Sequence, residues 1–410
     1  MVTDVIVIGG GAAGLCAAVY LKMKNSNLSV RLIEASPRVG KKLALTGNGR
    51  CNITNKEISL NNYHGEDVSF CEYALNTYNR EFCETFFEEI GVPFVFEGNK
   101  AFPLSLQAAS VVDCLRFAAD SLGVITHLET KVNNIQISGG NYKVIAGNIN
   151  FLAKNVITAT GLFSGGERLG CDGSMLAVLK KAGYKTVKPT PAIVQVKTEV
   201  DVVKQLKGIK INADATLKIE GKTVRKENGE VLFCDYGLSG PPVLQISREI
   251  SRTDKATEIS LDIFPDKDFN DLYNMLSKRA ELLSFRNLDE FFTGMLNKRL
   301  GQVILKLADC KLSESVSVLN SAKLKKITSI LKNFGFKVVG TTGFANSQVT
   351  AGGLATSQFD NKTMMSKNAK GFYAIGEILD IDGDCGGFNL QWAWSSAICA
   401  AEAILGDVKC

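Results

Sequence analysis

The stretch VIVIGGGAAG near the amino terminus places a short apolar run directly before a glycine-rich turn. Val5–Ile8 are four consecutive β-branched apolar residues, a pattern typical of a parallel strand buried on both faces. The glycines that follow have the spacing G-x-G-x-x-G, and residues 15–24 have helical character. A strand, a glycine turn and a helix in this order predict the first half of a Rossmann-type α/β unit.

Each glycine of this turn has its own physical role in a dinucleotide site. Gly9 permits the tight turn, Gly11 leaves room for a pyrophosphate near the backbone, and Gly14 lets the helix pack closely on the strand. The start of the helix, with Ala12 and Ala13, offers unpaired N–H groups and a positive dipole end to phosphates.

A second predicted strand, Val30–Ile33, ends at Glu34, 20 residues after Gly14. An acidic side chain at this place accepts hydrogen bonds from ribose hydroxyls and disfavours a 2′-phosphate. We therefore expect Glu34 and the adjacent Ala35 at the ribose of a bound dinucleotide.

Three distant segments favour FAD over NAD as the bound dinucleotide. NVITATG predicts a buried strand that ends in Ala159, Thr160 and Gly161, and GFYAIGE predicts another that ends in Gly376 and Glu377. DGDCGGFNLQWAWSSA then leads into an apolar helix, whose first amides are expected to face the electron-rich ring of a flavin. These segments are expected to surround one long ligand that extends along the whole edge of the sheet. The length of FAD suits this arrangement better than that of NAD. We find no second strand-GxGxxG-helix unit, so a nicotinamide cofactor would dock transiently or not at all.

Composition argues against several other kinds of site. The 11 cysteines are scattered without a C-x-x-C pair, which indicates a reducing cytoplasm and mostly inert thiols. His64 and His127 are the only histidines, so we expect neither a zinc site nor a histidine triad, and no bound metal. The longest apolar run is broken by glycines and no secretion signal is recognisable, so we expect a soluble cytoplasmic protein that does not enter membranes.

Over nearly its full length the chain resembles the bacterial FAD-binding conserved flavoproteins, also called aminoacetone oxidase-like proteins. That family includes a bile-acid reductase of gut clostridia. The matching stretches are VIVIGGGAAG, GKKLALTGNGRCNITN, NVITATG, GEVLFCDYGLSGP and GFYAIGEILDIDGDCGGFNLQWAWSSA. The resemblance implies an α/β fold, with a Rossmann-type FAD-binding domain of the glutathione-reductase-like superfamily and an inserted β domain that carries a helical subdomain. Because members differ in assigned substrate, it implies a cofactor more firmly than a reaction.

In the resembling family, the stretch KKLALTGNGRCNITN is the loop beside the pyrophosphate and the flavin. The resemblance implies that Lys41, Lys42 and Arg50 balance phosphate charge, and that Gly47 and Gly49 allow close backbone approach. It places Val132 against the adenine, on a strand expected at residues 128–137. The other cofactor contacts that we expect are Thr46, Asn52, Asp382, Gly387, Asn389 and Leu390.

Departures from the family pattern limit what can be carried over. Cys51 stands alone in its loop, and a single thiol cannot form the internal disulfide of disulfide reductases. We therefore interpret Cys51 as a buried packing residue. Cys171 precedes Asp172-Gly173 where the family usually has G-D-G, and Cys234-Asp235 stands where it often has Thr-His. The substrate pocket is therefore expected to differ from that of common members.

Pattern changes along the chain predict the domain organisation. The FAD-binding domain is expected at residues 1–190 and 370–410, with a boundary at Pro189–Pro191. Alternating β-branched residues and a hairpin signal at KENGEV predict a β domain at residues 191–265 that returns at 336–369. Charged, leucine-rich patterns predict a helical insert at residues 266–335.

These observations lead us to expect an FAD-dependent oxidoreductase that reduces an activated C=C bond of an apolar enone with NAD(P)H. The resemblance suggests a 3-oxo-4,6-diene bile acid. One alternative is an amine oxidase of the aminoacetone type that forms hydrogen peroxide. Another is a flavoprotein that binds a partner such as RNA without catalysis of its own. The sequence does not predict the catalytic residues. Tyr236 is a candidate proton donor, although a tyrosine in such a place more often packs or makes a structural hydrogen bond.

Nucleic acid is not the favoured partner. The basic residues of the helical insert are interpreted as a solvated face without interleaved aromatic side chains. These residues are Lys298, Arg299, Lys323, Lys325 and Lys326. The sequence predicts no oligomeric state.

Overall fold

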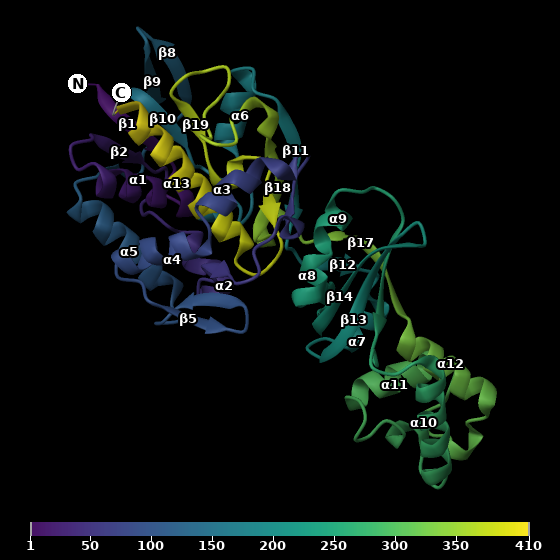
Figure 1. Ribbon diagram of the computed structural model, residues 1–410. Coiled ribbons are helices and arrows are strands. Elements are labelled where there is room, and N and C mark those ends of the chain that lie inside the picture. Colours follow the sequence, from purple (N-terminus) through teal and green to yellow (C-terminus); the bar gives the residue numbers. More distant parts are fainter. Residues whose placement is uncertain (1, 409–410) are drawn as a thin grey trace. The chain divides into compact units, whose positions relative to one another are not determined.

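A computed structural model describes residues 2–408 of the chain (Figure 1). Its contacts divide the chain into two compact units, unit 1 of Met1–Pro191 with Phe344–Cys410 and unit 2 of Ala192–Gly343. Each unit has its own cluster of buried apolar side chains.

Unit 1 is built on a seven-stranded sheet with the order β7-β2-β1-β10-β9-β8, in which β19 also pairs with β10. The pairs β7–β2, β2–β1, β1–β10 and β10–β19 are parallel. Because parallel strands end at the same edge, this order brings the ends of β1, β2, β10 and β19 together. The strands are β1 (Thr3–Ile8), β2 (Val30–Ile33), β7 (Ile125–His127), β8 (Asn134–Ser138), β9 (Asn141–Ala146), β10 (Ile149–Thr158) and β19 (Phe372–Ala374).

Two apolar helices, α1 (Ala12–Lys24) and α13 (Phe388–Val408), pack against each other in unit 1 (Figure 1). Both are rich in alanine and other apolar residues, and most of their side chains are buried, as expected for helices enclosed on several sides. The remaining helices of the unit are α2 (Thr46–Gly49), α3 (Glu72–Thr77), α4 (Arg80–Glu89), α5 (Ala108–Ser121) and α6 (Ser174–Lys181).

Three smaller sheets complete unit 1. The first has the order β3-β6-β5, the second pairs β20 with β4, and the third pairs β11 with β18. Their bounds are β3 (Thr54–Asn55), β4 (Tyr63–His64), β5 (Phe94–Glu97), β6 (Lys100–Pro103), β11 (Thr186–Ala192), β18 (Val349–Leu354) and β20 (Asp382–Gly383). The β4–β20 pair joins a segment that follows the glycine-rich loop to the segment that precedes α13.

Unit 2 contains a closed barrel with the strand order β12-β15-β14-β13-β16-β17. Alternate residues of its strands are buried, as in Ala213, Ala215 and Leu217, which is the period that places every second side chain inside a barrel. The strands are β12 (Val196–Thr198), β13 (Lys210–Ile219), β14 (Lys222–Phe233), β15 (Gly237–Ser239), β16 (Thr257–Asp262) and β17 (Phe334–Thr341).

Helices of unit 2 form two groups along the chain. Three short ones are α7 (Val200–Gln205), α8 (Pro241–Gln245) and α9 (Ser247–Ser251). Three longer ones lie between β16 and β17, namely α10 (Phe269–Leu282), α11 (Lys298–Leu307) and α12 (Ser321–Lys332). The barrel and these helices correspond to the β domain with a helical subdomain that the resemblance implied.

The structure differs from the sequence expectations in three places. Residues 344–369 belong to unit 1 and not to the β domain, because β18 pairs with β11. KENGEV is no hairpin turn but lies within the continuous strand β14, where Gly229 pairs with Ala213 and faces Pro242. Residues 128–133 do not form the expected strand, since β7 ends at His127 and β8 begins at Asn134.

Candidate cofactor site

The predicted glycine turn brings three separate segments of unit 1 into contact. A side chain at Gly14 would place its Cβ 1.9 Å from the carbonyl oxygen of Gly9, and one at Gly9 would lie 2.6 Å from the carbonyl oxygen of Ala159. A Cβ at Gly376 would lie 3.0 Å from that of Ala13. These approaches join the end of β1, the start of α1 and the segments after β10 and β19.

The start of α1 has the features of a phosphate site. Its amino-terminal capping residue is Gly11, which has no side chain that could bond to the first amides of the helix. The Gly11 carbonyl accepts a hydrogen bond from Leu15 N–H. Space for a Cβ at Gly11 is open, with no atom within 4 Å. Free amides at a helix amino terminus next to open space fit a pyrophosphate.

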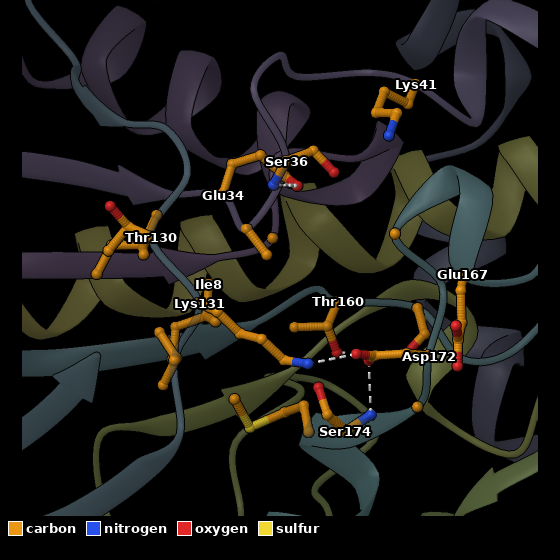
Figure 2. Close-up of a pocket in the computed structure, with 18 of the residues that line it drawn as sticks. Ile8, Glu34, Ser36, Lys41, Thr130, Lys131, Thr160, Glu167, Asp172 and Ser174 are labelled. Carbon is orange, nitrogen blue, oxygen red and sulfur yellow. Dashed lines mark hydrogen bonds and ion pairs between the residues drawn. The ribbon is translucent and has the colours of Figure 1, made fainter. Parts of the chain in front are cut away.

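A cavity of about 290 Å³ opens at the ends of β1 and β2 (Figure 2). Seven of the residues predicted to contact the cofactor line it, namely Gly9, Glu34, Ala35, Lys41, Val132, Thr160 and Gly161. The cavity therefore gathers residues from four segments that are far apart in the sequence. Its position beside the glycine turn fits the adenosine half of FAD.

Glu34 is held in place at the rim of this cavity by backbone amides. Its Oε2 accepts a hydrogen bond from Gly10 N–H at 2.7 Å. Its Oε1 accepts one from Ser36 N–H, also at 2.7 Å (Figure 2). A carboxylate oxygen has a second lone pair, so these bonds leave acceptor capacity for a ribose hydroxyl. The ribose contact itself stays a prediction.

The cations of the glycine-rich loop have different surroundings. Lys41 lines the cavity, whereas Lys42 forms an ion pair with Glu377 at 2.5 Å. Arg50 pairs with Glu97 and stacks 4.3 Å from the centre of the Phe102 ring. Carboxylates therefore balance the charges of Lys42 and Arg50. Of the three cations, Lys41 is the one that lines the cavity.

The loop itself is a left-handed turn within α2, in keeping with its polar, glycine-rich sequence. Gly47 and Asn48 have positive φ values of 58° and 56°, and Gly49 has 81°. Thr46 donates its hydroxyl hydrogen to the carbonyl of Leu43. Cys51, directly after the turn, is fully buried, and burial raises the pKa of its thiol to about 12. A thiol in this state is neutral and poorly nucleophilic, as expected of a packing residue.

Around Glu377, a polar network links the loop to two other segments. Ser164 donates its hydroxyl hydrogen to Oε1 of Glu377 at 2.5 Å, and Thr350 N–H donates to the same oxygen at 3.3 Å. Lys42 also contacts the Ser164 hydroxyl. The carboxylate is therefore the meeting point of residues from the loop, the segment after β10 and β18.

Residues before α13 form a second glycine-rich turn. A Cβ at Gly387 would lie 2.6 Å from the carbonyl oxygen of Thr54, and Gly387 has a φ of 98°. Asn389 exchanges hydrogen bonds with the backbone of Gly383 and so fixes the turn, while Asp382 lies buried in β20. Leu390 is half-buried at the start of α13.

Asn52 provides an independent sign of a ligand site. Its Oδ1 is buried and has no hydrogen-bond partner among residues 2–408, and a Cβ at Gly387 would lie 2.9 Å from it. Buried polar atoms are rarely left unpaired without a reason such as a ligand. The open space at Gly11, the free amides of α1 and this oxygen together fit the FAD that the sequence predicts.

Sequence reasoning missed part of the cavity lining. The missed residues include Lys131 on the 128–133 segment and, on the segment that leads into α6, Gly170, Asp172, Gly173, Ser174 and Met175. Figure 2 shows Lys131 and Asp172 meeting at the cavity. The sequence departs from G-D-G at Cys171-Asp172-Gly173, but nothing in it pairs this segment with residue 131. The two segments meet because one follows β7 and the other follows β10, and both strands belong to the same sheet.

Tyr236 lies in unit 2, on the short segment between β14 and β15, and is half-buried. Burial and the neighbouring Cys234 thiol raise the pKa of its phenol. Asp235, in the place of the family's histidine, forms an exposed ion pair with Lys207 at 2.6 Å.

None of the helices within residues 2–408 is both long and apolar enough to cross a lipid bilayer.

Comparisons with known proteins identify the family of the chain. The family described as HI0933-like protein Rossmann domain matches residues 3–403. The chain is 31% identical, over 97% of its length and 98% of the relative's, to the 3-dehydro-bile acid delta(4,6)-reductase of Clostridium scindens. It is 29% identical, over the same shares of both chains, to the ribosomal RNA dihydrouridine synthase of Haemophilus influenzae.

Solved structures extend the comparison to the fold. A quinol-fumarate reductase structure superimposes with a TM-score of 0.52 at 15% identity, over 98% of this chain and 70% of that one. A likeness at this identity concerns the fold alone, and the fold class predicted from the sequence is confirmed. The chain belongs to the HI0933-like Rossmann family and is an FAD-dependent oxidoreductase.

Proposed function

We propose that the protein reduces a C=C bond conjugated with a carbonyl group, in an apolar enone such as a 3-oxo-4,6-diene bile acid, with NAD(P)H as electron source. The observation that carries the proposal is the 31% identity to a delta(4,6)-reductase over nearly the whole length of both chains. The identity extends over both units and is not confined to the Rossmann unit.

FAD, when bound, would supply the hydride that such a reduction requires. The amides of α1, Glu34 and the segments around Gly161 and Gly376 would hold it. A reduction of this kind also needs a proton, delivered to the carbon next to the carbonyl. Tyr236 remains our candidate for its source, since a raised pKa keeps its phenol protonated throughout the neutral range.

The relative from Haemophilus influenzae supports a second candidate, the uracil of an RNA. Uracil contains a C=C bond conjugated with a carbonyl, and its reduction gives the dihydro base, so the reaction class is the same. Unit 2 has 24 Lys and Arg against 19 Asp and Glu, which leaves 23 of each, out of the chain's 47 and 42, for unit 1. The whole net charge of +5 therefore resides in unit 2, which favours contact with a polyanion.

The decisive experiment is anaerobic spectroscopy of the purified FAD-loaded protein. NADH or NADPH should bleach the flavin bands, and a 3-oxo-4,6-diene steroid should restore them and gain two mass units. An RNA transcript offered in place of the steroid tests the second candidate by the same gain in uridine mass. Restoration by RNA alone would replace the steroid proposal.

Two controls keep the result interpretable. A saturated 3-oxo steroid, which lacks the C=C bonds, should leave the reduced spectrum unchanged. Bleaching by aminoacetone with release of peroxide, but by neither nicotinamide, would overturn the proposal in favour of the amine oxidase.

A further inference from the structure

Two chain segments form opposite lips of the cavity in unit 1. Thr130, Lys131 and Val132 line one side, and residues 170 and 172–175 line the other (Figure 2). The ammonium of Lys131 and Oδ2 of Asp172 lie 2.5 Å apart and so connect the lips. The two residues lie 41 positions apart in the sequence. None of the strand pairs described above joins their two segments.

The lips differ in how the rest of the chain holds them. Backbone bonds from Thr130 N–H to Glu34 carbonyl and from Glu129 N–H to Ser36 carbonyl, at 2.9 and 3.1 Å, attach the first lip to the end of β2. The second lip is a turn with left-handed glycines at Gly170 and Gly173, with φ values of 79° and 66°. The side chain of Asp172 connects this turn directly to the first lip, and Gly170 of the turn also lies close to Ser36.

Asp172 is suited to such an attachment. Its Oδ1 accepts a hydrogen bond from Ser174 N–H at 2.9 Å, which fixes the carboxylate at the start of α6. Burial alone would raise its pKa, but the hydrogen bonds from Lys131 and Ser174 outweigh this effect and lower the pKa. The carboxylate is therefore ionised at neutral pH and pairs with the lysine as a full charge.

We propose that the Lys131–Asp172 ion pair is a latch that keeps the second lip closed over the adenosine half of FAD and slows its release. Both are positioning residues, because they act by holding the segments that surround the cofactor. The proposal rests on FAD binding in this cavity, and it does not depend on which substrate the protein reduces.

A competing explanation is that Lys131 attracts the phosphates of FAD directly. The two explanations predict opposite signs for Asp172. If the pair is a latch, Asp172→Asn opens the lip and speeds release. If Lys131 acts directly on FAD, the loss of a nearby negative charge strengthens that attraction and slows release.

The test measures the rate of FAD release from the holoenzyme, without substrate, by the rise of flavin fluorescence after dilution into an excess of an unrelated FAD-capturing apoprotein. Lys131→Gln and Asp172→Asn should each speed release about two- to fivefold, the range for a partly exposed ion pair. The swapped variant K131D/D172K should return the rate to within about twofold of the unmodified protein. Salt at 0.5 M should speed release from the unmodified protein and not from the single variants.

The ion pair between Lys154 and Asp4 is the matched control. It also joins a lysine to an aspartate, at 2.7 Å and with similar exposure, but at the amino-terminal end of β1. Lys154→Gln should leave the release rate unchanged. Equal rates for all variants, or slower release from Asp172→Asn, would overturn the latch. Because no substrate is used, a failed latch and a failed reductase proposal are told apart.

Discussion

Gly9, Gly11 and Gly14 lie within six residues of each other, but they are required for two different physical reasons. At Gly9 and Gly14 a side chain would collide with backbone of the protein itself. At Gly11 it would meet nothing within 4 Å. Two of the glycines therefore serve the fold, and the third leaves space for a ligand.

Alanine substitutions separate these roles. Gly14→Ala should destabilise unit 1 by about 1–3 kcal/mol, because its Cβ would lie 1.9 Å from the Gly9 carbonyl oxygen. Gly11→Ala should leave stability within about 0.5 kcal/mol and weaken FAD binding roughly tenfold or more. Urea unfolding and fluorescence titration with FAD measure the two effects. A Gly11→Ala protein with unchanged FAD affinity would show that the pyrophosphate lies elsewhere.

Between elements, the ion pair of Lys42 and Glu377 joins the glycine-rich loop to the segment after β19. Glu377 is 18% exposed and Lys42 is 27% exposed, so water screens their attraction only in part. The same carboxylate accepts hydrogen bonds from Ser164 and Thr350. This one side chain therefore sets the relative position of three segments at the cofactor site.

Loss of the charge at Glu377 should be costly. Glu377→Gln leaves the Lys42 ammonium without its carboxylate, and we expect a loss of about 1–3 kcal/mol of unfolding free energy. Trp392 and Trp394, the only tryptophans, lie in α13 of unit 1, so their fluorescence in urea reports on this unit. Arg116→Gln, which breaks a well-exposed pair with Asp113, is the control and should change little. Equal effects of the two substitutions on unfolding free energy would argue against the proposal that Glu377 sets the relative position of the three segments.

At the scale of the whole molecule, the chain has two separate apolar cores. One contains the sheet and helices of unit 1, and the other contains the barrel and helices of unit 2. The residues that we assign to FAD all belong to unit 1. Ligand binding should therefore stabilise one core directly and not the other.

Calorimetry of the FAD-free protein should show two unfolding transitions, since proteins with more than one core depart from two-state behaviour. FAD at a hundred times its dissociation constant should stabilise unit 1 by about 2.7 kcal/mol and raise only the transition that tryptophan fluorescence follows. If both transitions moved together, FAD would have to contact both units.

The amino-acid sequence by itself determined the Rossmann unit and the family, and it predicted seven of the residues that line the cavity. Its signals are local, because the glycine turn, the acid after the second strand and the small residues at strand ends reflect short-range backbone geometry. The same local reasoning failed at KENGEV, where Gly229 is needed for the close approach of Pro242 and not for a turn.

The tertiary structure alone decided which distant side chains meet. Lys131 and Asp172 pair across the cavity, and Glu377 takes the charge of Lys42 that the resemblance had assigned to phosphate. The return to unit 1 at residue 344 depends likewise on the pairing of β18 with β11. Contacts of this kind depend on strand order and packing, which a single sequence does not record.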